Sequence, residues 1–329
     1  MCQFGNVLMI QTPNPKHPNP SIMKILITGG AGYIGNELVF ELLRDPAVEE
    51  IIIYDNLSRK NFNLFLDTRN EPHKVRFVYG ELLDTRKLRQ VLKGMDVVYH
   101  LAAKVSTPLA TENSHLFEQI NHWGTAELVY AIEESDVKKL VYLSTTSVYG
   151  ASEEMTGIDT PPDPKTFYGS SKLRGEAHVE RLIDKRQVWI IRSGNVYGYS
   201  PSVRFDAVIN RFMFDANFIG RIQITGNGKQ KRAFVHVSKL VNMLANLLRH
   251  ELPSGIYNFS EHNLSIEYIA GVIKEIYPSL DMIFVNQHLV MREIKILPDE
   301  RILPLLTAEP VSFKEELTRF KEKFSFASK

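Results

Sequence analysis

Apolar runs alternate with amphipathic stretches along the first part of the chain. The runs are short and rich in Val, Ile and Leu, which is typical of buried parallel strands. They are KILITG (24–29), EEIIIYD (49–55), KVRFVYG (74–80), MDVVYHLAA (95–103), KKLVYLST (138–145) and QVWIIRSG (187–194). Apolar side chains at helical spacing between them predict helices over 36–44, 86–92, 117–134 and 170–184. This alternation predicts an α/β fold with a doubly wound parallel sheet.

The regular alternation fades after residue 191. Segments 192–232 and 261–329 are rich in loops, whereas FVHVSKLVNMLANLLRH (234–250) has the pattern of a strand end followed by a helix. We therefore expect a larger domain built from 23–191 and 233–260. A smaller C-terminal lobe follows, built from 192–232 and 261–329. The Pro- and Asn-rich residues 1–22 are expected to form a flexible extension.

The charge balance limits the classes of partner. The 329 residues include 39 Lys and Arg against 38 Asp and Glu, a formal net charge of +1. This is a poor match for a surface that binds nucleic acid or an anionic membrane. Cys2 is the single cysteine, which excludes an internal disulfide framework and a Cys-rich metal site. No apolar run approaches the roughly 18 residues of a membrane span. We expect a cytoplasmic protein with no nucleic-acid or membrane partner and no metal.

A glycine-rich turn follows the first predicted strand. Gly29, Gly32 and Gly35 give the spacing G-x-x-G-x-x-G at the start of the first predicted helix. Such glycines let backbone amides approach a pyrophosphate at the helix N-terminus. Asp55 lies about 20 residues further on, where a carboxylate binds an adenosine ribose and repels a 2′-phosphate. The pattern favours NAD over NADP, although the neighbouring Arg59 could offset that repulsion.

Two further motifs carry candidate chemistry. Tyr168 and Lys172 stand four residues apart at the start of a predicted helix and so share one face. A nearby ammonium would lower the pKa of the phenol and allow it to take a proton from a substrate hydroxyl. The run LSTTSVYG (143–150) places hydroxyls at the carboxyl end of a parallel strand, where ligands bind in open α/β sheets.

In combination, these motifs resemble the extended short-chain dehydrogenase/reductase family, within it the nucleotide-sugar epimerase/dehydratase group. The resemblance covers about residues 23–260. It is carried by ITGGAGYIG (27–35), YDNLS (54–58), HLAA (100–103), NHWGT (121–125), STTSVYG (144–150), YGSSK (168–172), RSGNVYG (192–198) and RAFVHVSKLV (232–241). It implies a Rossmann-like, NAD-binding larger domain and a substrate-binding C-terminal lobe.

The resemblance also implies roles for individual residues. The catalytic residues would be Tyr168 as acid–base, Lys172 and Thr145. The NAD-binding residues would be Gly29, Gly32, Tyr33, Ile34, Gly35, Asp55, Asn56, Glu81, Leu82, Ala102, Ala103, Asn121 and Lys172. The substrate-binding residues would be Thr145, Thr146, Ser147, Tyr168, Asn195, Arg232 and Arg292.

Several positions depart from the family pattern. Thr146 and Ser147 stand where the 4,6-dehydratases of the group carry the Asp-Glu pair that drives loss of water. Glu81 replaces the usual Asp at the adenine, and Lys239 replaces a usual Asp near the second lobe. Thr146 and Ser147 argue against a dehydration reaction. Glu81 and Lys239 leave the identity of the substrate undetermined.

The resemblance therefore implies an NAD-dependent epimerase of a nucleotide sugar, with a UDP-sugar inverted at C4 as the expected reaction. One alternative is an NAD(P)-dependent reductase or dehydrogenase of a keto-sugar or another alcohol. Another is a regulator that binds the cofactor without catalysis. The family often forms homodimers through two helices of each subunit. Here the matching helices are 117–134 and 170–184, with apolar surface expected from Leu116, Ile120, Leu128 and Ile132.

Overall fold

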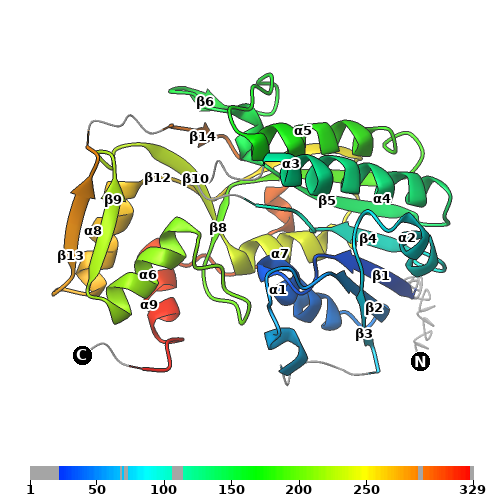
Figure 1. Cartoon of the computed structure of the whole chain (residues 1–329), viewed down its shortest axis with the longest axis horizontal. Helices are drawn as coiled ribbons and strands as arrows, with labels where there is room; N and C mark the ends of the chain where they lie inside the picture. The colour runs from blue at the N-terminus through cyan, green and yellow to red at the C-terminus, as the bar shows by residue number, and fades with distance from the viewer. Residues whose placement is uncertain (1–21, 67–68, 70–72, 106–113, 288–291, 327–329) are drawn as a thin grey trace, which may run out of the picture.

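Seven parallel strands form the central sheet of the larger domain (Figure 1). The computed structural model describes residues 22–66, 69, 73–105, 114–287 and 292–326. The spatial order of the strands is β11-β7-β5-β4-β1-β2-β3, so the chain runs outward from β1 in both directions. The strands are β1 (Met23–Thr28), β2 (Val48–Asp55), β3 (Val75–Tyr79), β4 (Val97–His100), β5 (Lys139–Thr145), β7 (Gln187–Ser193) and β11 (Gly255–Phe259). The predicted doubly wound α/β fold is confirmed.

Helices cover both faces of this sheet. One face carries α1 (Tyr33–Leu43) and α7 (Val237–Asn246), and the other carries α2 (Thr85–Val91), α4 (Gly124–Glu133) and α5 (Phe167–Glu180). Neighbouring side chains of a strand point to opposite faces. In β1, Ile25 and Ile27 therefore pack with α1 and α7, whereas Leu26 packs with α2 and α4.

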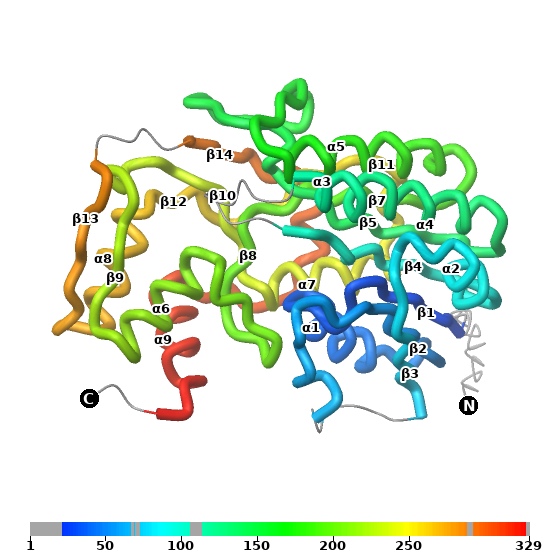
Figure 2. Tube along the Cα trace, in the orientation of Figure 1, coloured from blue at the N-terminus to red at the C-terminus, as the bar shows by residue number. Residues whose placement is uncertain are grey.

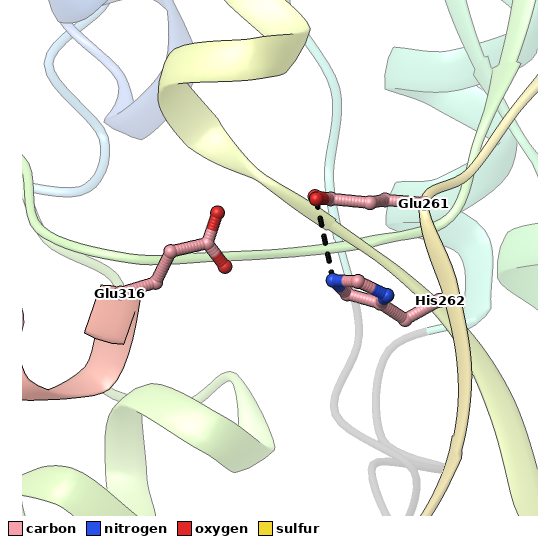
Figure 3. Close-up of side chains that lie close together, drawn as sticks. All are labelled: Glu261, His262 and Glu316. Atoms are coloured by element: carbon pink, nitrogen blue, oxygen red, sulfur yellow. Dashed lines mark ion pairs between the residues drawn. The ribbon is translucent and has the colours of Figure 1, made fainter. Parts of the chain in front are cut away.

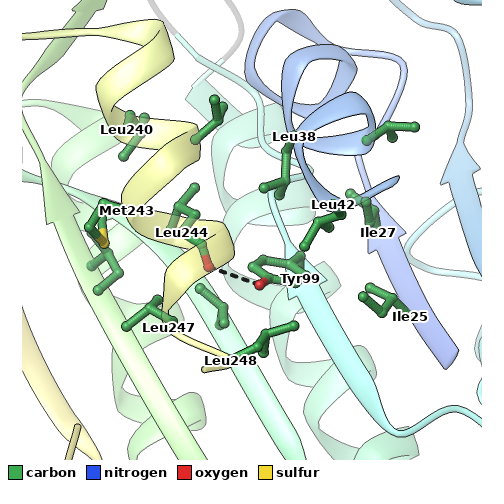
Figure 4. Close-up of a cluster of buried hydrophobic side chains, with 14 of the residues drawn as sticks. Ile25, Ile27, Leu38, Leu42, Tyr99, Leu240, Met243, Leu244, Leu247 and Leu248 are labelled. Atoms are coloured by element: carbon green, nitrogen blue, oxygen red, sulfur yellow. Dashed lines mark hydrogen bonds between the residues drawn. The ribbon is translucent and has the colours of Figure 1, made fainter. Parts of the chain in front are cut away.

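The packing of α1 and α7 over β1 forms the core of one face (Figure 4). Leu38 of α1 and Leu244 of α7 are fully buried there. Tyr99 of β4 is also fully buried, and its hydroxyl donates a hydrogen bond of 2.9 Å to the carbonyl of Leu244. An unpaired buried hydroxyl would be unfavourable, so this bond fixes the position of α7 on the sheet.

The helix predicted over 117–134 begins earlier and is not uniform. It comprises α3 (Ser114–Phe117), the π-helical stretch η2 (Glu118–Trp123) and α4. Extra residues in a helical turn are frequent at functional sites. None of the helices in the described ranges combines the length and apolar character of a membrane span.

The second lobe packs three helices around a small core. These are α6 (Val208–Phe218), α8 (Ile266–Ile276) and α9 (Phe313–Lys321). They lie against β9 (Arg221–Thr225), which pairs in parallel with β13 (Asp281–Val285). The fully buried residues of this core include Ile209, Met213, Ile222 and Ile269. The lobe stands beside the carboxyl ends of the central strands in Figure 1.

A three-stranded sheet connects the two parts. It consists of β8 (Asn195–Tyr197), β10 (Lys231–His236) and β12 (His262–Ser265). The sequence predicts that the chain returns from the second lobe to the larger domain at residue 233. In the structure, β10 pairs with β8 and β12 and not with the central sheet. The return begins at Val237, with α7. Alternating apolar residues indicate a strand but do not identify the strands that pair with it. Phe234 packs in the core of the second lobe, whereas Val235 packs in the core of the larger domain.

The remaining elements are short. They are the 3-10 turns η1 (Asn63–Leu66), η3 (Thr146–Tyr149) and η4 (Leu303–Leu305), and the paired strands β6 (Met155–Thr156) and β14 (Lys295–Ile296). A flexible extension is predicted for residues 1–22, of which residues 1–21 lie outside the described ranges.

Leu244→Ala should lower the free energy of unfolding by about 2–5 kcal/mol, because it leaves a cavity between α7 and the sheet. Equilibrium denaturation in urea measures the loss. Leu297→Ala is the matched control, since that side chain is 56% exposed. Equal losses in the two variants would contradict the assignment of Leu244 to the core.

Candidate active site

The glycine turn lies between β1 and α1. Gly29 has a φ of +73°, and a Cβ at this position would come within 2.6 Å of the backbone nitrogen of Ala102. Gly32 precedes α1, and no side chain caps that helix. The amides of its first turn are therefore available to an anion such as a pyrophosphate.

Asp55 lies beside this turn at the end of β2. Its two carboxylate oxygens accept hydrogen bonds from the backbone nitrogens of Leu57 and Ala31, at 2.8 and 3.1 Å. Burial raises the pKa of Asp55, while these two amides act in the opposite direction. Next to it, the amide nitrogen of Asn56 donates to Glu81 at 2.9 Å. The acid predicted for ribose binding is therefore held rigidly against the glycine turn.

A cavity of about 450 Å³ lies between the larger domain and the second lobe. Its wall brings together all the predicted substrate-binding residues and part of the predicted cofactor set: Gly29, Gly32, Tyr33, Ile34, Ala103, Thr145, Thr146, Ser147, Tyr168, Asn195, Arg232 and Arg292. The other predicted positions are not among the residues of this wall: Gly35, Asp55, Asn56, Glu81, Leu82, Ala102, Asn121 and Lys172. One cavity thus joins the glycine turn to the candidate catalytic groups.

Tyr168 lies in the first turn of α5, which begins after Thr166. The Thr166 hydroxyl accepts a hydrogen bond from the backbone nitrogen of Gly169 at 2.9 Å and caps the helix. Tyr168 reaches the cavity together with Thr145, at the end of β5. Burial raises the pKa of Tyr168, and the charge of Arg204 and a hydrogen bond with Thr145 partly offset this.

Lys172 lies one turn further along α5 and is 1% exposed. Its Nζ lies 3.9 Å from the centre of the Tyr142 ring. Burial lowers the pKa of Lys172 to about 7, against the opposing charge of Glu176. The sequence predicts that the Lys172 ammonium lowers the pKa of Tyr168. In the structure, the charge of Arg204 acts on the pKa of Tyr168 in this direction, while Lys172 is itself desolvated and its action on the phenol stays a prediction.

A buried ion pair supports this part of α5. Arg192 of β7 contacts Glu176 through two nitrogens, with 2.7 Å between Nη2 and Oε2. The Ser144 hydroxyl also donates to Glu176, and Nη1 of Arg192 donates to the Tyr149 hydroxyl at 2.9 Å. Glu176 therefore fastens α5 to β5 and β7. The sequence analysis missed this residue, although its spacing of four from Lys172 on the same helix face was a usable signal.

Asn121 is fully buried in η2. Its side chain accepts from the backbone nitrogen of Lys104 at 2.7 Å and donates to the carbonyl of the same residue at 2.9 Å. A further bond of 3.0 Å reaches Ser171 of α5. Asn121 thus holds the loop that carries Ala103 and links it to the catalytic helix.

Two arginines lie on the second-lobe side of the cavity. In the described part of the chain, neither Arg232 nor Arg292 forms a hydrogen bond or ion pair through its guanidinium. Burial lowers the pKa of Arg232, and the charge of Arg292 adds to this effect. Two unpaired guanidinium groups that face one cavity form a site for an anion such as a diphosphate. Asn195, whose amide nitrogen donates to the Ala233 carbonyl at 3.0 Å, lies in the same wall.

The comparisons with known proteins agree with this geometry. A model of the NAD dependent epimerase/dehydratase family matches residues 25–259. The chain is 32% identical over 250 residues to the dTDP-D-glucose 4,6-dehydratase of Bos taurus, covering 73% of this chain and 69% of that protein. It is 33% identical over 231 residues to YtcB of Bacillus subtilis, an uncharacterized UDP-glucose epimerase, covering 69% and 72%. The chain belongs to the NAD dependent epimerase/dehydratase family.

A solved structure extends the likeness to the second lobe. The UDP-glucuronic acid 4-epimerase of Bacillus cereus, in complex with UDP-glucuronic acid and NAD, has a TM-score of 0.78 at 26% identity. The match covers 91% of this chain and 98% of that one. Membership of the NAD dependent epimerase/dehydratase family identifies an enzyme that uses NAD, as the sequence predicts. The uncapped turn at Gly32 and the carboxylate of Asp55 fit the pyrophosphate and the ribose of that cofactor.

The sequence analysis did not identify three charged residues of the cavity as site residues. Arg204 and Asp206 come from the loop between β8 and α6, and Lys165 comes from the loop before α5. Each lies in a segment without helical or strand periodicity, so no pattern assigned it to a face. With Arg59, Arg232 and Arg292, they give the described cavity wall five cations and one carboxylate. The site is therefore suited to a ligand with several negative charges.

One group in the described residues could in principle hold a metal ion (Figure 3). Side-chain ligand atoms of Glu261, His262 and Glu316 lie within 4.8 Å of one another. However, Lys239 of α7 donates to both glutamates, with 2.8 Å to Glu316. Burial would raise the pKa of Glu261, but hydrogen bonds from His262 and Lys239 lower it to about 2. An ammonium therefore already balances the charge of this cluster.

Asp55→Asn should weaken NAD binding and reduce the preference for NAD over NADP by about tenfold, because one charge-assisted hydrogen bond contributes about 1.5 kcal/mol. The amide keeps an oxygen for the backbone of the turn but removes the charge that repels a 2′-phosphate. Calorimetric titration with both cofactors measures the ratio. Asp45→Asn is the control, since Asp45 lies outside the cavity and accepts a hydrogen bond from the backbone nitrogen of Ala47. An unchanged ratio in Asp55→Asn would place cofactor selection elsewhere.

Proposed function

We propose that this enzyme is an NAD-dependent epimerase that inverts C4 of a UDP-linked sugar. The observation that carries the proposal is the convergence of Tyr168, Thr145 and the unpaired Arg232 and Arg292 on the cavity that also contains the glycine turn. A sugar held by its diphosphate at the arginines would extend toward the phenol. Relatives named as UDP-sugar 4-epimerases, such as the Bacillus cereus enzyme, support this choice of substrate.

The proposed chemistry assigns a role to each group. Tyr168 removes the proton of the C4 hydroxyl while the C4 hydrogen leaves as hydride, and NAD supplies the acceptor for that hydride. Thr145 forms a hydrogen bond with the side chain of Tyr168 and stabilises its phenolate form. Arg204 provides a nearby positive charge with the same effect. Arg232 and Arg292 keep the diphosphate bound while the oxidised sugar turns its other face toward the cofactor.

The cavity argues against loss of water from the substrate. Thr146 and Ser147 follow Thr145, and neither side chain is an acid at neutral pH. Among the described residues of the wall, the single carboxylate is Asp206. It is engaged by Arg59 and Arg204, at 3.1 and 2.9 Å. Elimination needs a general acid and a general base near the sugar, so the dehydratase activity named for some relatives is disfavoured here.

We also propose that the enzyme forms a homodimer through α4 and α5. Trp123, the last residue of η2, and Tyr130 of α4 are 54% and 39% exposed. The sequence predicts apolar surface from Leu116, Ile120, Leu128 and Ile132, with some of them on the sheet, and Leu128 and Ile132 are fully buried there. An aromatic surface flanked by charged residues is suited to a second copy of the chain.

The function is tested by incubating the purified enzyme and NAD with UDP-, GDP- and dTDP-sugars, including UDP-glucose and UDP-glucuronic acid. Proton NMR follows the anomeric signals while absorbance follows NADH. A new anomeric signal without accumulation of NADH is expected. Steady formation of NADH would show a dehydrogenase. Silence in both signals, with consumption of NADH only when a keto-sugar is added, would show a reductase, and complete silence would favour a regulator.

Tyr168→Phe should reduce kcat by at least about 100-fold, because positioned acid–base groups contribute about 10²–10⁴. Binding of NAD should change little, which calorimetry can check. Tyr79→Phe removes a hydroxyl from a side chain that is 57% exposed and is the matched control. Retention of turnover in Tyr168→Phe would remove this residue as the acid–base.

Arg232→Ala should raise the KM for the nucleotide sugar by about tenfold or more while kcat changes less, because a charge-assisted hydrogen bond contributes about 1.5–3 kcal/mol to binding. Steady-state kinetics separates the two parameters. Arg221→Ala is the control, since its side chain is 57% exposed and pairs with Asp281 outside the cavity. A fall in kcat at constant KM would argue against a diphosphate contact.

A further inference from the structure

The loop of residues 198–207, called here the bridging loop, belongs to the second lobe but contacts the larger domain at two places. It leaves β8, passes beside the start of α1 and then enters α6 (Figure 2). Both contacts involve segments that the dinucleotide site uses: the glycine turn and the loop that follows Asp55. The bridging loop therefore connects two cofactor-binding segments with the substrate lobe.

The first contact is buried. The hydroxyl of Tyr33, the first residue of α1, donates to the carbonyl of Gly198 at 2.6 Å. Asn210 donates to the same hydroxyl at 3.3 Å, and the Ser200 hydroxyl donates to the Tyr33 carbonyl at 3.2 Å. The phenol of Tyr33, predicted to bind NAD, is thus engaged with the bridging loop. This contact fixes the bridging loop next to the glycine turn.

The second contact is partly exposed and consists of charges. Arg59, in the loop after β2, lies 3.1 Å from the carboxylate of Asp206. Arg204 contacts the same oxygen at 2.9 Å. A few residues further along the same segment, the Asn63 side chain donates to the carbonyl of Pro201. We call the group of Arg59, Asp206 and Arg204 the clasp. All three of its members line the cavity that contains Gly29 and Tyr168.

The backbone around Arg59 is held in an unusual conformation. Leu57 and Lys60 have φ values of +53° and +56°, the left-handed region that costs a residue with a Cβ about 1–2 kcal/mol. Such conformations persist where surrounding contacts determine them. Here the two strained residues flank Arg59 on either side and direct it toward the second lobe. The loop is therefore built to present this guanidinium to Asp206.

We propose that the clasp is the device that retains NAD between catalytic cycles, with Asp206 and Arg59 as its positioning residues. A dinucleotide that lies along the glycine turn and reaches Tyr168 would be enclosed by the bridging loop on the side where Arg59 meets Asp206. Release would require this ion pair to open. Retention suits a reaction in which hydride is returned to the same substrate. The inference rests on NAD binding and not on the direction of the proposed reaction.

The test measures exchange of bound NAD in the absence of any sugar nucleotide. The enzyme is loaded with deuterium-labelled NAD and diluted into excess unlabelled NAD. The label that remains bound is measured by mass spectrometry after rapid desalting. Arg59→Ala and Asp206→Asn should each exchange about fivefold faster than the unaltered enzyme, the upper range for a partly exposed ion pair. The double variant should be no faster than the single variants, because both remove the same interaction.

Two further measurements keep the test decisive. Arg249→Ala is the matched control, since Arg249 forms a similar ion pair with Asp45 at 3.0 Å, outside the cavity. It should exchange at the unaltered rate. Salt at 1 M, where the screening length is about 3 Å, should accelerate exchange more in the unaltered enzyme than in Arg59→Ala. This arm tests the ion pair by screening its charges and not by removing a side chain.

Equal exchange rates in the unaltered enzyme and both single variants, or effects that multiply in the double variant, would overturn the proposal. So would a rate in the unaltered enzyme that salt does not change. Because no sugar is present, these outcomes are independent of the epimerase assay. Slow exchange that depends on the clasp, together with silence in the sugar panel, would support the clasp and reject the proposed reaction.

Discussion

The carboxylate of Glu176 is removed from water, and Arg192 is the group that makes this burial tolerable. A charge left alone in such a place would be unfavourable by several kcal/mol, so the two side chains fix each other's position. Glu176 is carried by α5 and Arg192 by β7, and Ser144 and Tyr149 connect the pair to the end of β5. Tyr168, Lys172 and the hydroxyls after β5 therefore occupy positions that this one ion pair determines.

The cavity in front of this pair has the opposite character. Two of its cations, Arg232 and Arg292, have no ion-pair partner in the described part of the chain, whereas Arg192 is buried and paired with Glu176. Arg232 and Arg292 repel each other when no anion lies between them. This repulsion is relieved by a ligand with several negative charges, which is why the site is suited to a nucleotide diphosphate. Asp206 is the carboxylate of the described cavity wall, and its ion pair with Arg59 joins the two lobes.

One lysine of the larger domain holds acidic groups of the second lobe. Lys239 of α7 lies between Glu261 and Glu316. Glu316 belongs to α9 and also accepts a hydrogen bond from Tyr197, whose ring lines the cavity. The cluster therefore ties the C-terminal helix to the substrate side of the site. The positive charge of Lys239 is thus balanced by acidic partners from two distant segments.

The sequence by itself determined the succession of strands and helices along the larger domain and the positions of the glycine turn, of Asp55, and of Tyr168 and Lys172. These features depend on residues that lie close together along the chain, where periodicity and spacing can be read directly. Only the tertiary structure decided that β10 leaves the central sheet, that Arg204 shares the cavity wall with Tyr168, and that Asp206 pairs with Arg59. Each of these depends on contact between segments far apart in the chain, which local pattern does not specify.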